Sequence, residues 1–145
     1  MLFAALALPF PATASTALNC FGSAPGKTVV QVLAIMDCAF EDGSLGWCDI
    51  DVKINDQWLK LPRTLRSVTS PDVFPEAPDD LAGTKTLKPP VTVLRVLDEN
   101  KKVILELTLD KIVGSDTEVV FLGRATLSWK ERHFKGLVVK CDEPG

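Results

Sequence analysis

The sequence contains no tyrosine, only one histidine and no Gly-x-Ser-x-Gly segment. A single histidine cannot build the His-rich ligand sets of catalytic zinc sites, and the missing segment removes a common signature of a serine nucleophile. The one histidine, His133, stands in the charged segment 130–133, which we interpret as an exposed hairpin turn. We therefore predict no catalytic residue, no cofactor and no enzymatic activity.

The chain also lacks an excess of positive charge and any long apolar run. Its 16 Lys and Arg residues against 19 Asp and Glu residues give a formal net charge of −3, which disfavours binding along an anionic nucleic acid. No apolar run approaches the roughly 18 residues that a membrane-spanning helix needs. We therefore expect neither a nucleic-acid partner nor a membrane span.

The N-terminal region has no charged side chain before Lys27. Residues 2–10 form a compact apolar run, and Ala-Thr-Ala at 12–14 fits the small-residue cleavage site of a signal peptide. We predict that residues 1–14 are a signal peptide, that residues 15–145 form one domain, and that the product is secreted, extracellular or periplasmic. Because a positively charged start is missing, the alternative is a retained apolar strand.

Four cysteines follow this segment, an even number in a short chain. In an oxidising compartment they would form two disulfides, and three pairings are possible. Cys38 and Cys48 stand at the two ends of a short loop between adjacent strands. Cys20 and Cys141 lie near the ends of the mature chain, and such ends are frequently close together in compact domains. We predict the bridges Cys38–Cys48 and Cys20–Cys141.

Apolar and polar residues alternate along several segments, which is the pattern of strands with one buried face. In 103–110 the apolar residues fall on the odd positions, and 124–130 and 137–141 repeat the pattern. In 48–55 the even positions are apolar, beginning with Cys48. The segment 28–36 is apolar on both faces. The residues predicted to face the core are Ile50, Val52, Ile54, Leu105, Leu107, Leu109, Leu127, Trp129, Leu137 and Val139.

Turn residues separate these segments and indicate the fold class. Asn55 and Asp56 end one strand, residues 98–101 join two strands as a hairpin, and Gly123 marks a predicted bulge. We count about eight strands and find no helical period. Short strands at this spacing predict an all-β antiparallel sandwich, jelly-roll or immunoglobulin-like, stapled by disulfides.

The segment 62–90 interrupts this rhythm. Its part 67–90 holds five of the ten prolines in the chain, and proline removes the donors that a central strand needs. Long irregular segments are uncommon in compact domains and are frequently functional. We predict a proline-rich loop at 62–90, either as a surface crossover between sheets or as a presented binding loop.

Aromatic side chains are the favoured binding feature. Trp47 and Trp58 flank one acidic strand, and Phe74 lies among the prolines. Rigid aromatic side chains anchor protein partners in interfaces, and their ring faces can stack on sugars. We predict a secreted, non-catalytic binding module that recognises a protein or glycan partner through Phe74, Trp58 and Trp47. In the alternative, Trp47 and Trp129 fill the core.

Two other functions stay open. One is a secreted enzyme inhibitor or effector that presents the proline-rich loop, and the other is a small hydrolase that uses acidic residues. The segment 37–56 holds six acidic residues, whose oxygens suit Ca²⁺, but their spacing matches no EF-hand loop. We predict no metal site, with calcium in this segment as the alternative.

Overall fold

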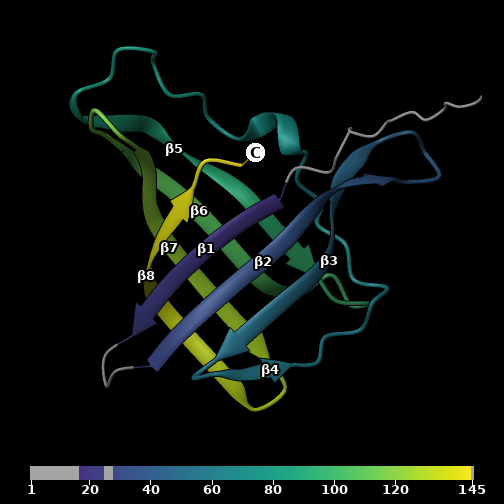
Figure 1. Ribbon diagram of the computed structural model, residues 1–145. Coiled ribbons are helices and arrows are strands. Elements are labelled where there is room, and N and C mark those ends of the chain that lie inside the picture. Colours follow the sequence, from purple (N-terminus) through teal and green to yellow (C-terminus); the bar gives the residue numbers. More distant parts are fainter. Residues whose placement is uncertain (1–16, 25–27, 145) are drawn as a thin grey trace, which may run out of the picture.

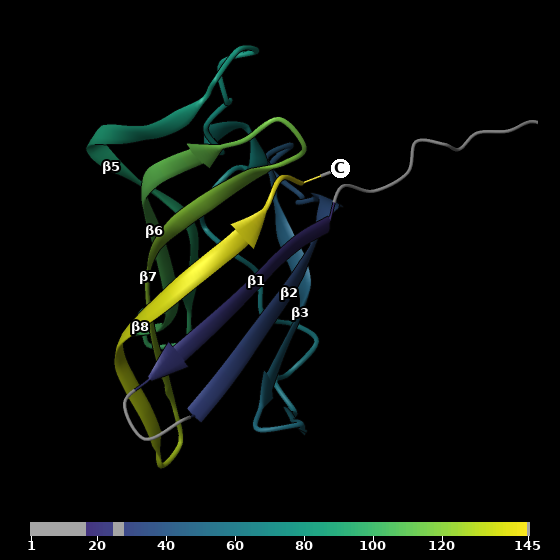
Figure 2. The same cartoon turned by 60° about the vertical axis from the view of Figure 1, so that its left-hand side comes forward.

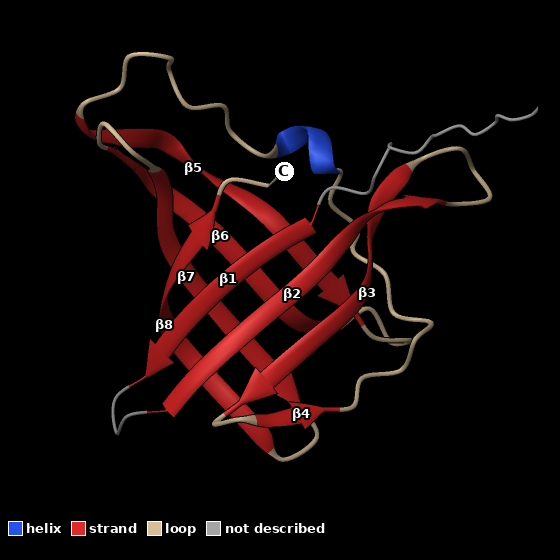
Figure 3. Cartoon of the chain, viewed as in Figure 1, coloured by secondary structure: helices blue, strands red, loops and turns tan. Residues whose placement is uncertain are grey.

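The computed structural model describes residues 17–24 and 28–144, so the predicted signal peptide at 1–14 lies outside the described residues. Strands dominate the described chain (Figures 1 and 3). No helix among the described residues is long and apolar enough to cross a membrane. The strands are β1 (Ala17–Ala24), β2 (Thr28–Ala39), β3 (Leu45–Ile54), β4 (Gln57–Leu59), β5 (Gly83–Leu97), β6 (Val103–Gly114), β7 (Val119–Trp129) and β8 (Arg132–Asp142). A short 3-10 helix, η2 (Pro71–Val73), precedes β5.

All eight strands belong to one antiparallel sheet in the order β4-β3-β2-β1-β8-β7-β6-β5. The sheet curls into a half-barrel, with β1 to β3 on one side and β5 to β7 on the other (Figure 2). The predicted all-β antiparallel class is therefore confirmed. The predicted division into the two sheets of a sandwich is replaced by one continuous sheet.

Strand β1 joins the two halves of this sheet. It pairs along its whole length with β2 and through Cys20–Ser23 with β8, where Cys20 stands opposite Cys141. No strand was predicted over these residues. The structure pairs Cys20 with Cys141 and Cys38 with Cys48, as predicted. The first disulfide thus crosses the junction between the two halves.

The irregular segment 60–82 runs from β4 to β5 across the side that the sheet leaves open. Ser67 donates its backbone N–H to the Trp47 carbonyl at 2.9 Å and forms a bridge pair with Val96. The Ser67 hydroxyl also accepts a bond from the Trp47 N–H at 2.9 Å and donates to the Thr69 carbonyl at 2.9 Å. Ser67 is 1% exposed. These bonds connect β3 to β5, so this part of the segment serves as a crossover.

The proline-rich loop is shorter than predicted, because β5 begins at Gly83 and includes Pro89 and Pro90. These prolines are accommodated for two reasons. Strand β5 lies at an edge of the sheet, where a missing donor costs little. The pairing with β6 is also interrupted between Thr86 and Val91.

The core lies inside the curl of the sheet and confirms the predicted alternation. Nine of the ten residues predicted to face inward are buried, and Trp129 is partly buried against the same cluster. The buried nine are Ile50, Val52, Ile54, Leu105, Leu107, Leu109, Leu127, Leu137 and Val139.

The alternation predicted for 48–55 is wrong at its start. Trp47 and Ile50 are both buried, while Cys48 is only partly buried. The cause is a bulge in β3, where the pairing with β2 shifts and Asp49 takes a φ of 51°. An extra residue in one strand moves the following side chains to the opposite face.

Gly123 lies at the predicted irregularity. The two segments predicted on either side of it form one strand, β7. The bulge itself lies in the partner strand β6, where Asp110 is the extra residue. It falls between the pair Leu109–Gly123 and the pair Lys111–Leu122. A Cβ on Gly123 would overlap the backbone oxygen of Thr108 and lie 2.7 Å from the Leu109 Cα. Only glycine permits this approach of β6 and β7.

We expect Gly123→Ala to lower the free energy of unfolding by about 1–3 kcal/mol, the usual cost of overpacking. Urea unfolding measures the loss. Thr126→Ala, at an exposed position of the same strand, is the control and should change stability by about 0.5 kcal/mol or less. Equal losses in the two variants would contradict a close approach at Gly123.

Candidate functional site

Trp47 lies in the core rather than on a binding surface. Its side chain is 1% exposed, and its indole Nε1–H donates to the Val93 carbonyl at 3.0 Å. This buried hydrogen bond satisfies the one polar group of the ring. Trp47 therefore cannot contact a partner, and the alternative in which it fills the core is the one that the structure shows.

Phe74 pins the proline-rich segment to the sheet. It follows η2, whose first turn is capped by the Ser70 hydroxyl accepting from the Asp72 N–H. The Phe74 ring meets the fully buried Phe121 edge to face, with ring centroids 4.8 Å apart. Phe74 is partly buried and packs against the core, so its main contact is internal.

Trp58 is the predicted residue that the structure leaves on the surface, with 51% of its area exposed. It stands on β4 directly opposite Lys53 of β3. The Lys53 ammonium lies 5.2 Å from the centroid of the indole ring, within the range of a cation–π contact. The ring is thus held by its neighbour while one side stays open to solvent.

The turn between β3 and β4 sets this arrangement. Asn55 and Asp56 both have positive φ, 47° and 69°, as in the two-residue turns that match the twist of a hairpin. Asn55 is further held by Val29 of β2, donating its N–H to the Val29 carbonyl at 2.9 Å and accepting the Val29 N–H at 3.0 Å. The sequence Asn55-Asp56 therefore fixes the register that places Trp58 beside Lys53.

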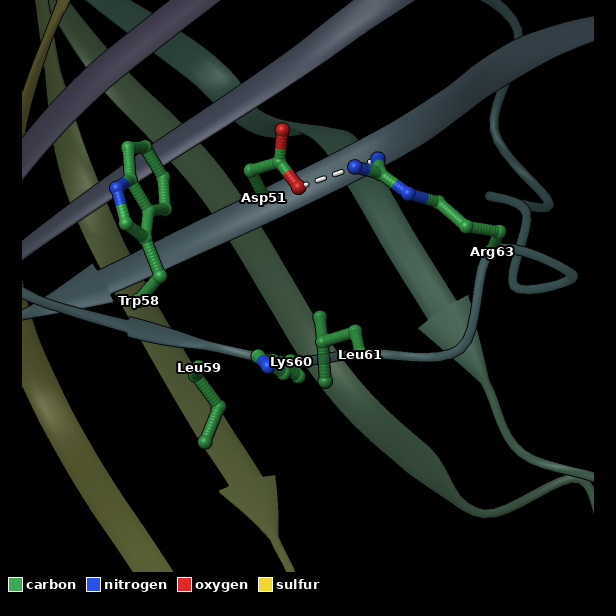
Figure 4. A pocket seen from close by; sticks show the side chains of 6 residues that line it. All are labelled: Asp51, Trp58, Leu59, Lys60, Leu61 and Arg63. Carbon is green, nitrogen blue, oxygen red and sulfur yellow. Dashed lines mark hydrogen bonds and ion pairs between the residues drawn. The ribbon is translucent and has the colours of Figure 1, made fainter.

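An open pocket of about 470 Å³ lies beside Trp58, and Figure 4 shows the side chains that line it. Arg63 reaches into it from the segment after β4, and its guanidinium lies 3.2 Å from the Asp51 carboxylate and 3.9 Å from that of Asp49. The ring of Trp58 and the carboxylate of Asp51 lie on the same side of β3 in this view. The complete lining is Asp51, Trp58, Leu59, Lys60, Leu61 and Arg63.

The acidic residues described between 41 and 56 do not converge, and the Asp37 side chain lies outside the described part. Asp49 and Asp51 face Arg63, and Asp42 closes its own turn by accepting from the Ser44 hydroxyl at 2.6 Å and the Ser44 N–H at 2.9 Å. The Ser44 hydroxyl, followed by the Ser44 backbone N–H, lowers the pKa of Asp42. Among the described residues no three Asp, Glu, His or Cys side chains are grouped to hold a metal ion.

One pair of polar side chains was missed in the sequence. Ser128 Oγ and His133 Nδ1 lie 2.7 Å apart as cross-strand partners of β7 and β8. The two-residue turn at 130 and 131 places them opposite each other, so a register counted outward from that turn would have found them. In the part of the chain that the structure describes, no carboxylate bonds the ring to complete a triad. The pair joins the exposed ends of two strands.

The site around Trp58 therefore offers an open aromatic ring, an ammonium, a carboxylate and a guanidinium on a strand scaffold. Such groups recognise a partner by stacking, ion pairing and hydrogen bonding. No protein family, curated protein or solved structure compared with the chain matches it.

Proposed function

We propose that the protein is a secreted, non-catalytic binding module that contacts a protein or glycan partner around Trp58. The exposure of the Trp58 ring on a strand of the sheet is the observation that supports this. Tryptophan is enriched among the residues that dominate binding energy, and sites on strands are held more rigidly than sites on loops. The flanking Asp51–Arg63 pair adds groups that can orient a polar partner.

Secretion is part of the same proposal. Two disulfides are typical of proteins that fold in oxidising compartments. The apolar run and small-residue site at 1–14 supply the corresponding export signal.

Two observations make the other functions less favoured. Contact with Phe121 turns Phe74 toward the core, which does not support presentation of the proline-rich loop to an enzyme. The Asp51 and Asp49 carboxylates are exposed and face Arg63, whereas the general acid of a glycoside hydrolase typically stands in an apolar pocket.

We expect Trp58→Ala to weaken partner binding by about 30-fold or more, as for a dominant interface residue, while changing stability by about 0.5 kcal/mol or less. Binding is measured on an array of neutral and acidic glycans and on an array of extracellular proteins. Val68→Ala removes another exposed apolar side chain, 60% exposed, and should bind like the wild type. If Trp58→Ala retains every interaction of the wild type, the proposed surface is wrong.

A further inference from the structure

Seven residues on the outer face of the sheet stand side by side as cross-strand partners, running from β4 to β6. We call them the basic row. Its members are Trp58, Lys53, Gln31, Phe21, Lys140, Leu122 and Lys111. The sequence neighbours of the five central members, Lys53 to Leu122, are buried, among them Val52, Cys20 and Phe121. Because successive side chains of a strand point to opposite faces, the basic row faces away from the core.

The charge of the basic row is opposite to that of the chain. The row carries three lysines and no carboxylate, although the chain has a net charge of −3. The adjacent row on the same face holds Val29, Ser23, Val138 and Arg124, which add a fourth cation and again no carboxylate.

Four carboxylates flank the basic row. Asp110 is the residue directly before Lys111. Asp51 and Asp142 each stand two residues along the strand from a lysine of the basic row, and Asp56 stands in the turn after β3. Asp51 is paired with Arg63 at 3.2 Å, which reduces its effect on the row. The basic row itself is therefore a line of three cations on an acidic protein, bordered by these carboxylates.

Aromatic rings and open hollows alternate with these charges. Trp58 is 51% exposed and Phe21 is 44% exposed. A second open hollow of about 340 Å³ has Phe21, Lys53 and the Asp56 carboxylate in its lining. Lys53 of this hollow contacts the Trp58 ring, which lines the first pocket. This contact holds the ammonium in place before any ligand arrives.

We propose that the basic row binds an anionic polysaccharide lying across the strands, an inference that rests on the proposed binding function. The lysine ammonium groups would pair with carboxylate or sulfate groups, and the rings of Phe21 and Trp58 would stack on the C–H faces of the sugars. Aromatic ring faces carry partial negative charge, which suits the polarised C–H bonds of a sugar ring.

The shape of the basic row favours a polysaccharide over an acidic protein. Seven strands with six spacings of about 4.8 Å give the basic row a path of about 29 Å around the outside of the curled sheet (Figure 2), which a flexible chain molecule can follow. Lysine is depleted in protein interfaces, whose centres are apolar and well packed. Here Lys53 and Gln31 stand between the two exposed rings, Lys140 follows Phe21, and the hollows are open to solvent.

The test compares four soluble polymers by titration against the wild-type protein. Polygalacturonate and dextran sulfate supply carboxylate and sulfate on sugar, dextran is the neutral sugar polymer, and polyglutamate is the acidic polypeptide. We expect the wild type to bind the first two, with an affinity that falls as salt is added. Lys53→Gln with Lys140→Gln should weaken that binding about tenfold, since two exposed charge contacts are removed.

The matched control is Lys101→Gln with Lys102→Gln, which removes two exposed lysines from the turn between β5 and β6. It should bind like the wild type. Equal loss in both double variants, or wild-type binding by the Lys53 and Lys140 variant, overturns the inference. Tighter binding of polyglutamate than of both polysaccharides also overturns it and identifies an acidic protein partner.

A separate outcome distinguishes the two proposals. If dextran binds as tightly as polygalacturonate and Trp58→Ala abolishes both, the anionic assignment fails and the binding function stands. If Trp58→Ala binds every polymer like the wild type, the proposed binding surface fails as well.

Discussion

Replacing Cys20 and Cys141 together by alanine is expected to lower the free energy of unfolding by about 4–5 kcal/mol. The reason is the length of chain that this disulfide closes, since its two cysteines are 121 residues apart. A cross-link over a long segment removes many conformations from the unfolded chain. The measurement is urea unfolding of the oxidised wild type and the double variant at one pH and temperature.

The second disulfide supplies the control, because replacing Cys38 and Cys48 makes the same chemical change. Those cysteines are only 10 residues apart, so the chain-entropy relation gives about 2.7 kcal/mol. The difference between the two variants isolates the effect of loop length. If the two variants lose the same stability, restriction of the unfolded chain is not the main contribution of the long disulfide.

The position of the long disulfide in the sheet gives this prediction a structural meaning. Strand β1 pairs with β2 along its full length but with β8 only through Cys20–Ser23. The β1–β8 junction is therefore short, and the disulfide lies within it. Hydrogen exchange in the double variant should rise first at this junction, because regions with few backbone bonds open most readily.

The strand segments and their buried faces were predictable wherever the alternation was clear. Leu105, Leu107 and Leu109 alternate with polar residues and are fully buried. Strand β1 was missed because its outward position 21 is phenylalanine and its inward position 22 is glycine. This reverses the expected pattern. The two-sheet prediction came from the number and spacing of short strands, which do not distinguish two packed sheets from one curled sheet.

The candidate site was only partly predictable, for a local reason. Trp47 and Trp58 flank the same acidic strand and cannot be told apart by composition. The bulge at Asp49 moves Trp47 to the inner face, and a bulge of this kind leaves no alternation signal. Trp58 follows a regular two-residue turn, so its place opposite Lys53 could have been counted from Asn55 and Asp56.

The basic row was beyond sequence reasoning because it depends on the order of the strands. Lys53, Lys140 and Lys111 are far apart in the chain and come together only because β1 pairs with both β2 and β8. No spacing rule within a single strand connects them. The net charge of −3 even argued against a positive surface, since net charge says nothing about how charges are distributed.

Leu107→Ala is expected to lower the free energy of unfolding by about 2–5 kcal/mol, the usual range for a buried leucine. Leu107 is fully buried in β6, and its cross-strand partners are Leu94 of β5 and Ala125 of β7, which are also buried. Its neighbours are fixed by pairing on both sides, so they cannot collapse easily into the cavity.

Thermal unfolding followed by circular dichroism measures this loss, with a shift in Tm of about 2–4 °C for each kcal/mol in a domain of this size. Glu106→Ala is the control, because Glu106 points outward and forms a half-exposed ion pair with Arg95 at 2.6 Å. Losing such a pair costs about 1 kcal/mol or less. A slip of one residue exchanges the two faces of a strand. Equal Tm values for the two variants would therefore show that β6 does not bury Leu107 and expose Glu106 as described.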